Sequence, residues 1–202
     1  MKNDLHGNPG KFWSYLSREK NWIDYILPKR TEKEFWNEGK LEAENIQKIA
    51  GEIDTTFVID YGCGIGRITK YFPHKEIIGI DVCEEFIEKA GEGFSTIKNF
   101  KEKEVATFIY CISVLQHNDE ANRKKIIDHI HSLLREGGKC FINFPMEKSL
   151  YVKTWFVHTF SEEEVRELFL QFSKVELVKG NLARYGGKIV SGQNEIFVIA
   201  TK

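Results

Sequence analysis

The chain has 202 residues, enough for one domain whose core does not depend on disulfides or metals. Hydrophobic residues make up 42% of it and charged residues 29%, as in an ordinary globular protein. Its 29 basic and 30 acidic side chains nearly cancel. This balance argues against a surface built mainly to bind nucleic acid.

The four cysteines are far apart in sequence, and none has the C-x-x-C or histidine spacing of a zinc site. We therefore expect no metal site and no disulfide framework. The N-terminus lacks the apolar core of a signal peptide, and no run of about 18 apolar residues is present. These features predict a cytoplasmic protein with no membrane partner.

The first fifty residues have helical patterning. One helix is expected over residues 11–27 and a second over residues 32–50, which ends at Gly51. These helices are predicted to form an N-terminal cap, residues 1–50, on one compact domain, residues 51–202.

The rest of the chain alternates strands and helices. Strands are predicted over residues 56–60, 76–81, 94–97, 106–111, 139–144, 174–178 and 195–201. Helices are predicted over residues 67–72, 84–90, 119–134 and 161–172. This order predicts an α/β fold with a Rossmann-like, doubly wound, seven-stranded and mostly parallel sheet. The last two strands lack a full helix between them, which indicates an antiparallel edge strand.

A glycine-rich loop follows the first predicted strand. Gly62, Gly64 and Gly66 stand at alternate positions after Asp60. Glycine allows a sharp turn and the close approach of a ligand to the backbone. Ligands of open α/β sheets bind at the carboxyl ends of the strands. The loop is therefore a candidate binding site.

Asp81 ends the second predicted strand, beside this loop. A carboxylate in that place can accept hydrogen bonds from both hydroxyl groups of a ribose. The loop and Asp81 together indicate a cofactor that contains adenosine.

Glycine spacing discriminates between such cofactors. The dinucleotide fingerprint G-x-G-x-x-G requires glycine at position 67, which is Arg67 here. Asp60, two residues before the first glycine, would repel a pyrophosphate but can pair with an ammonium group. The spacing favours a cofactor with an amino-acid end.

Residues 58–67 resemble the first motif of the class I S-adenosylmethionine-dependent methyltransferases, and residues 78–81 resemble the second. Residues 114–117 and 133–139 are similar to later motifs of that family. The resemblance covers roughly residues 40–200 and is greatest to small-molecule enzymes with a bare catalytic domain.

The resemblance implies that Asp60 and the glycines hold the methionine end of S-adenosyl-L-methionine and that Asp81 holds the ribose. The family often has an acidic residue beside the adenine, where this chain has Asn99. From the aromatic N-terminal region we select Trp36 for a cofactor or substrate contact. The expected binding residues are Asp60, Gly62, Cys63, Gly64, Gly66, Asp81, Val82, Asn99, Ser113 and Trp36.

Methyl transfer needs a general base only when the acceptor is protonated and weakly acidic. His117, after the fourth predicted strand, is the first candidate and His158 the second. The alternative for His117 is packing beside the cofactor or a place at the start of the next helix. The alternative for His158 is a place at the edge of a covering loop.

We therefore expect a methyltransferase that acts on an O or N nucleophile of a small molecule and releases S-adenosyl-L-homocysteine. A non-catalytic protein that binds S-adenosylmethionine, or a partner subunit, is the alternative. An NAD-dependent oxidoreductase is disfavoured by Arg67. The residues do not specify the acceptor.

Overall fold

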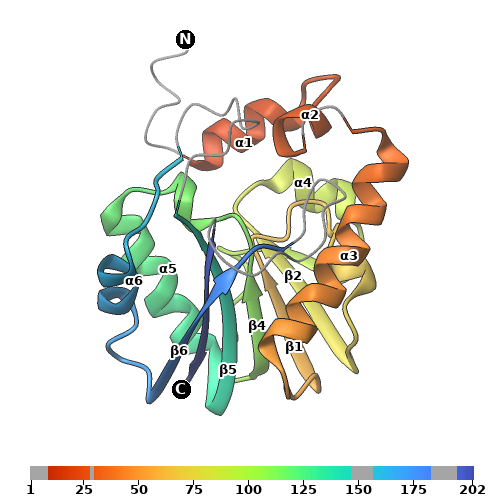
Figure 1. Cartoon of the computed structure of the whole chain (residues 1–202). Helices are drawn as coiled ribbons and strands as arrows, with labels where there is room; N and C mark the ends of the chain where they lie inside the picture. Colours follow the sequence, from red (N-terminus) through yellow and green to blue (C-terminus); the bar gives the residue numbers. More distant parts are fainter. Residues whose placement is uncertain (1–8, 28–29, 147–156, 183–194) are drawn as a thin grey trace.

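The computed structural model covers the whole chain and describes residues 9–27, 30–146, 157–182 and 195–202. A central sheet has helices against both of its faces (Figure 1). Its strands are β1 (Phe57–Tyr61), β2 (Glu76–Asp81), β3 (Phe94–Thr96), β4 (Ala106–Cys111), β5 (Leu134–Pro145), β6 (Lys174–Gly180) and β7 (Glu195–Thr201). The helices are α1 (Pro9–Ser17), α2 (Ile23–Ile26), α3 (Glu32–Ala50), α4 (Glu84–Ala90), α5 (Glu120–Leu133) and α6 (Glu162–Leu168). Short 3-10 turns lie at η2 (Thr69–Tyr71) and η3 (Leu115–His117).

The sheet has the strand order β3-β2-β1-β4-β5-β7-β6. Neighbouring strands from β3 to β5 are parallel, whereas β7 is antiparallel to both β5 and β6. The predicted α/β fold, with a mostly parallel seven-stranded sheet and antiparallel pairing near one edge, is confirmed. The order reverses between β1 and β4, which is the place where open sheets of this type bind ligands.

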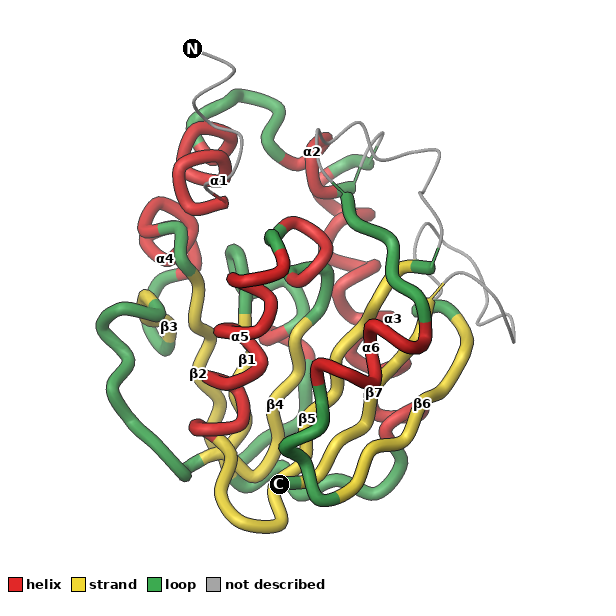
Figure 2. The backbone as a smooth tube through the Cα atoms, turned by 90° about the vertical axis from the view of Figure 1, so that its left-hand side faces the viewer, coloured by secondary structure: helices red, strands yellow, loops and turns green. Residues whose placement is uncertain are grey.

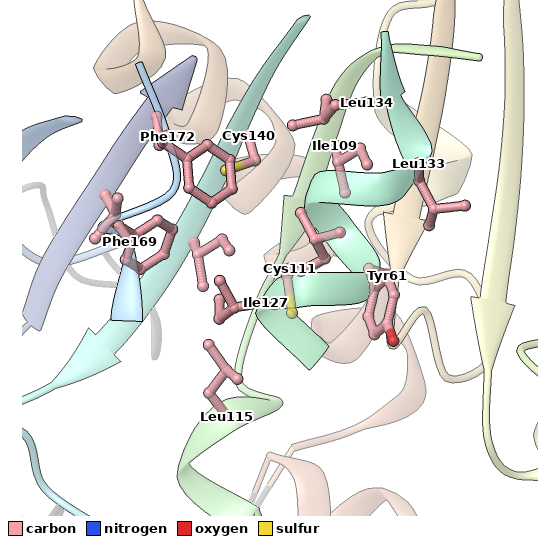
Figure 3. Close-up of a cluster of buried hydrophobic side chains, with 14 of the residues drawn as sticks. Tyr61, Ile109, Cys111, Leu115, Ile127, Leu133, Leu134, Cys140, Phe169 and Phe172 are labelled. Carbon is pink, nitrogen blue, oxygen red and sulfur yellow. The ribbon is translucent and has the colours of Figure 1, made fainter. Parts of the chain in front are cut away.

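Successive strand residues point to opposite faces of the sheet and build two cores. Ile59, Ile109 and Ile142 pack with α5 and α6, as Figure 3 shows for part of this cluster. Val58 and Phe108, one position away, pack with α3 on the other face. Figure 2, viewed from the side of α5 and α6, shows these two helices in front of the sheet. Burial on both faces explains why these strands are apolar runs without polar alternation.

The helix α3 agrees with its prediction from Glu32 to Ala50. Thr31 and Glu34 form a capping box at its start, and Gly51 follows its end with a φ of 69°. The single helix expected over residues 11–27 is wrong, because α1 ends at Ser17 and α2 begins at Ile23. The five residues between them carry no apolar side chain apart from Trp22, so continued helix would bury little there.

Three further predictions differ in the type of element or by four or more residues. The helix expected over residues 67–72 is only the 3-10 turn η2, because Pro73 forces Phe72 into an extended conformation with a ψ of 132°. The helix α6 ends at Leu168, four residues earlier than expected. The strand β5 begins five residues earlier than expected, since Leu134 pairs with Ala106 ahead of a register shift. Within the described ranges, no helix is long and apolar enough to cross a membrane.

Candidate functional site

The candidate site lies where β1, β2 and β4 end. The strand β7 ends near the C-terminus at one end of the sheet, and the parallel strands end at the opposite one (Figure 1). The helices α1 and α2 lie across that opposite end in both views (Figures 1 and 2). The residues that follow β1, β2 and β4 therefore lie at the end of the sheet over which α1 and α2 pass.

The glycine loop turns through three left-handed residues. The φ angles of Gly62, Gly64 and Gly66 are 80°, 55° and 78°. A Cβ atom on Gly62 would lie 2.2 Å from Cγ2 of Val114, and one on Gly66 would lie 2.4 Å from Cζ of Phe94. A Cβ on Gly64 would meet no atom within 4 Å. Two of the glycines thus allow close packing, while Gly64 faces open space where a ligand can approach the backbone.

Asp81 connects this loop to the end of β2. Its Oδ2 accepts a hydrogen bond of 2.8 Å from the amide of Gly64, and its Oδ1 accepts one of 2.9 Å from the amide of Cys83. The side chain is buried, which raises the pKa of its carboxyl group despite these bonds. A carboxylate has about four acceptor positions, so Asp81 keeps capacity for further donors such as hydroxyl groups.

Asp60 is buried on β1, and the charge of Arg67 acts on its carboxyl group only as the smallest of the influences on its pKa. Its Oδ2 accepts hydrogen bonds from Oγ1 of Thr69 at 2.5 Å and from the Tyr110 hydroxyl at 3.0 Å. Burial, with a smaller contribution from the negative charge of Asp81, raises the pKa of Asp60 to about 7. In the described part of the chain, neither carboxylate forms an ion pair within 4.0 Å. Two buried acids that form no ion pair with a described residue favour a positively charged ligand.

The predicted cofactor contact Val82 follows β2, and the predicted adenine contact Asn99 follows β3. Val82 is about half exposed, and Asn99 is exposed. Thr96, which pairs with Asp81 in the sheet, has a buried Oγ1 with no hydrogen-bond partner among the described residues. No local pattern singles out Thr96, since only the sheet register brings it beside Asp81.

Ser113 occupies an uncommon backbone conformation after β4. Its φ is 61°, and Glu104 is the other non-glycine residue with positive φ in the described ranges. The amide of Ser113 donates a 2.7 Å hydrogen bond to Oδ1 of Asn143, and Nδ2 of Asn143 donates one to the carboxylate of Glu195. Strained residues of this kind gather at functional sites. Asn143, which sequence reasoning did not select, therefore positions the backbone of a predicted site residue.

His117 lies under the N-terminal helix. Its ring contacts Trp13 of α1 edge-on, with centroids 5.4 Å apart. Trp13 also lies 6.4 Å from the ring of Phe86 on α4. The indole thus spans from the segment after β2 to the segment after β4. Sequence reasoning selected Trp36 and missed Trp13, because helix periodicity does not show which aromatic residue meets a distant element.

Polar contacts also hold α1 on α4. Glu85 accepts hydrogen bonds from Ser14 and Arg18, and Lys89 donates one to the carbonyl of Ser17. The hydrogen bonds that Glu85 accepts lower the pKa of its carboxyl group to about 2, and the bond from Ser14 contributes most. The cap therefore docks through a charged contact as well as through its aromatic rings.

Trp36 lies on the α3 side of the sheet. Lys70 is placed over its indole ring at 4.9 Å, and the ring of Phe35 lies 5.6 Å away. With Gly66 and Thr69, Trp36 lines a cavity of about 430 Å³. Its contact with cofactor or substrate stays a prediction.

His158 reaches the neighbourhood of His117 through the backbone. Its amide donates a 2.9 Å hydrogen bond to the carbonyl of Gln116, the residue before His117. Its Nε2 lies 3.1 Å from a carboxylate oxygen of Glu164. The two predicted bases therefore come from different segments that meet beside η3.

Cys63 and Arg67 support the loop. Burial raises the pKa of the Cys63 thiol well above its usual value, which disfavours the reactive thiolate form. Arg67 forms a 2.8 Å ion pair with the buried Glu42 of α3. In the described ranges, no group of three or more His, Cys, Asp or Glu side chains is placed to hold a metal ion.

Comparisons with solved structures show what the fold resembles. A methyltransferase of Thermotoga maritima, described as S-adenosylmethionine-dependent and a possible histamine N-methyltransferase, has 16% identity and a TM-score of 0.65, covering 89% of this chain and 98% of that one. The N-methyltransferase NodS of Bradyrhizobium japonicum, in complex with S-adenosylhomocysteine, has 15% identity and a TM-score of 0.61, covering 96% and 98%. The 1,6-didemethyltoxoflavin-N1-methyltransferase of Burkholderia thailandensis, also with S-adenosylhomocysteine, has 17% identity and a TM-score of 0.60, covering 96% and 90%.

Sequence comparison identifies the family. An uncharacterized protein of Methanocaldococcus jannaschii is 33% identical over 96 residues, which are 46% of this chain and 41% of that protein. The matched part thus spans about two fifths of that relative. A family model described as a methyltransferase domain matches residues 11–179. Because this match covers more than half of the 202 residues, the chain belongs to the methyltransferase domain family.

Proposed function

We propose that this chain transfers the methyl group of S-adenosyl-L-methionine to an O or N nucleophile of a small molecule. The observation that carries the proposal is the pair of buried carboxylates, Asp60 at the end of β1 and Asp81 at the end of β2, with the open backbone of Gly64 hydrogen-bonded to Asp81. Family membership and the structural likeness to enzymes that contain S-adenosylhomocysteine support it.

The charges of the site fit this cofactor. Its ammonium and sulfonium groups are positive, whereas Asp60 and Asp81 are buried acids that form no ion pair within the described part. Asp60 is the proposed partner of the ammonium group, directly or through water. Asp81 is the proposed acceptor for the ribose hydroxyls, which is consistent with its free acceptor positions.

The remaining predicted contacts complete the proposed binding site. Val82 and Asn99 are the proposed neighbours of the adenine, and Ser113 is placed after β4 by Asn143. The backbone at Gly62, Cys63, Gly64 and Gly66 is proposed to hold the methionine end. In this proposal residues 1–50 cap the cofactor domain, residues 51–202, and Trp36 contributes from α3.

The bound cofactor supplies a methyl group on a good leaving group, so the protein must mainly align the acceptor and exclude water. We assign water exclusion to α1, whose Trp13 contacts both Phe86 and His117. When the acceptor is a hydroxyl or an ammonium, His117 takes its proton. His158, held against Gln116, is the second candidate for that step.

A small molecule is the proposed acceptor because three of the similar structures are described as N-methyltransferases, one of them for 1,6-didemethyltoxoflavin. We place the protein in the cytoplasm, since its four buried cysteines are free thiols, as a reducing compartment keeps them.

Labelled methyl transfer tests the proposal. Purified protein is incubated with methyl-labelled S-adenosylmethionine and a fractionated metabolite extract, and the label is followed into small-molecule products. We expect label in a low-molecular-weight fraction. Clear cofactor binding with no transfer to any fraction would instead favour a non-catalytic binding protein or a partner subunit.

A further inference from the structure

The face of α5 that packs on the sheet begins with an arginine. Positions 123, 127 and 130 share one face of the helix because they are spaced by four and three residues. Ile127 and Ile130 are fully buried, and Arg123 is 92% buried, since only 8% of its surface is exposed. Arginine is rarely buried to this extent without a partner of opposite charge.

The guanidinium of Arg123 forms no ion pair within 4.0 Å with a described residue. Its Nη1 atom is buried and has no hydrogen-bond partner among the described residues. The group lies over the ring of Phe160 at 5.1 Å, a contact that does not replace a counter-ion. A buried charge that is unpaired opposes folding, and a bound anion would offset that cost.

Glu164 is the carboxylate that interacts with this charge, but its oxygens are already used. One accepts a 2.8 Å hydrogen bond from the amide of Ser161, and the other lies 3.1 Å from Nε2 of His158. The bond from Ser161, more than the charge of Arg123, lowers the pKa of Glu164. No ion pair within 4.0 Å joins Arg123 to Glu164 in the described ranges.

Ring and backbone contacts connect the arginine to the segment that carries the proposed base. The ring of Phe160, under the guanidinium, is 4.6 Å from the ring of His158. His158 in turn bonds the backbone of Gln116, next to His117. The Oε1 atom of Gln116 is also buried without a hydrogen-bond partner among the described residues. Two unsatisfied polar groups thus come from segments that meet at η3.

We propose that Arg123 binds an anionic group, a carboxylate or a phosphate, of the methyl acceptor. This inference rests on the proposed methyltransferase function and names the class of its substrate. A planar guanidinium offers paired donors that match both anions. Gln116 Oε1 accepts a hydrogen bond from an N–H or O–H group of the same molecule.

Inorganic phosphate and acetate are the probes. Each is titrated by calorimetry into the wild-type protein, with and without saturating S-adenosylhomocysteine, in a buffer free of other small anions. We expect saturable binding to the wild type and binding weaker by about tenfold or more for Arg123→Met. The control is Arg166→Met, which removes an exposed arginine paired with Glu162 on α6 and is expected to leave anion binding unchanged.

Thermal unfolding in the anion-free buffer separates this role from a structural one. The midpoint of Arg123→Met is expected to rise, because the variant removes an unpaired buried charge and extends the apolar face of α5. A fall in the midpoint together with unchanged phosphate and acetate binding would show that the guanidinium only supports the fold. If Arg123→Met does not fold, Arg123→Lys, which keeps the charge but lacks the paired donors, is expected to bind both anions more weakly.

The two anions distinguish the acceptor chemistry. Preference for phosphate indicates a phosphorylated acceptor, and preference for acetate indicates a carboxylic acid. Absence of saturable binding of both anions to the wild type would overturn the proposal. Absence of S-adenosylhomocysteine binding to the wild type would instead count against the proposed function. The two failures can be distinguished, because the anions are also titrated without S-adenosylhomocysteine.

Discussion

The amide of Gly64 donates a 2.8 Å hydrogen bond to Oδ2 of Asp81. This bond joins the loop after β1 to the end of β2, so one carboxylate shapes the loop and is also the proposed ribose acceptor. Loop geometry and cofactor affinity are therefore coupled through a single side chain.

Replacing Asp81 separates these two roles. Asp81→Ala is expected to weaken binding of S-adenosylhomocysteine by about 1.5 to 3 kcal/mol, the range for hydrogen bonds to a charged group. Asp81→Asn keeps an acceptor for one of the two amides and is expected to bind with intermediate affinity. Isothermal titration calorimetry measures both. Unchanged affinity of the alanine variant would mean that the ribose is held elsewhere.

Asp60 predicts a dependence of stability on pH. Its pKa of about 7 lies above the usual value of 3.8, so between these values the folded state retains a proton that the unfolded chain has lost. The free energy of unfolding therefore falls as pH rises from about 4 to about 7. Asp60→Asn removes this contribution and is expected to be more stable than the wild type at pH 8 by about 2 to 4 kcal/mol. Urea unfolding at pH 5 and pH 8 measures the free energy of unfolding of both proteins. The same change in this free energy between the two pH values for both proteins would contradict the prediction.

The same variant is expected to bind the cofactor more weakly, since it lacks the negative charge that would face the ammonium group. A gain in stability together with a loss of affinity would show that Asp60 lowers the stability of the fold and serves binding. Equal affinity at pH 8 would remove Asp60 from the proposed role.

Two glycines of the loop are expected to respond differently to alanine. In Gly62→Ala the new Cβ would lie 2.2 Å from Val114, so we expect a loss of about 3 kcal/mol in the free energy of unfolding. Gly64→Ala meets open space and is expected to lose only about 1 kcal/mol, from its positive φ. Its Cβ would instead occupy the side from which the cofactor is proposed to approach. A stable Gly64→Ala protein with wild-type affinity would place the cofactor elsewhere.

The ion pair between Arg67 and Glu42 is predicted to hold α3 against the glycine loop. The side chain of Glu42 is 1% exposed and that of Arg67 is 12% exposed. Glu42→Gln leaves a buried cation without its counter-charge and is expected to cost about 3 kcal/mol of stability. Glu44→Gln, on the same helix but in an exposed pair with Lys40, is the control and is expected to cost less than about 0.5 kcal/mol. Equal losses in chemical denaturation would contradict the assignment.

His117→Ala tests the proposed base. Turnover is expected to fall by about a hundredfold with cofactor affinity preserved, as for loss of general-base catalysis. His117→Phe keeps a ring against Trp13 and controls for packing. A phenylalanine variant with near-normal turnover would show that the ring serves only to support α1.

Much of this architecture follows from local signals. The helix α3 has a capping box at Thr31 and a glycine after its end, and both are local. The central strands are apolar runs because both faces are covered. The glycine loop and Asp81 could be found because their spacing is a property of one β–α–β unit.

Other features depend on contacts between distant segments. The place of Trp13 against His117 arises from the docking of α1 on α4, which helix periodicity does not specify. The positive φ of Ser113 depends on Asn143, thirty residues later on the next strand. The position of Arg123 in the first turn of a helix predicts an exposed side chain. It is buried because Phe160, from a distant segment, packs against it.

The most direct test of the central claim is a calorimetric titration of the purified protein with S-adenosylmethionine and, separately, with NAD. We expect saturable binding of S-adenosylmethionine at one site, weakened in Asp81→Ala, and no binding of NAD. Binding of NAD with none of S-adenosylmethionine would contradict the account of the loop after β1 and of the function built on it.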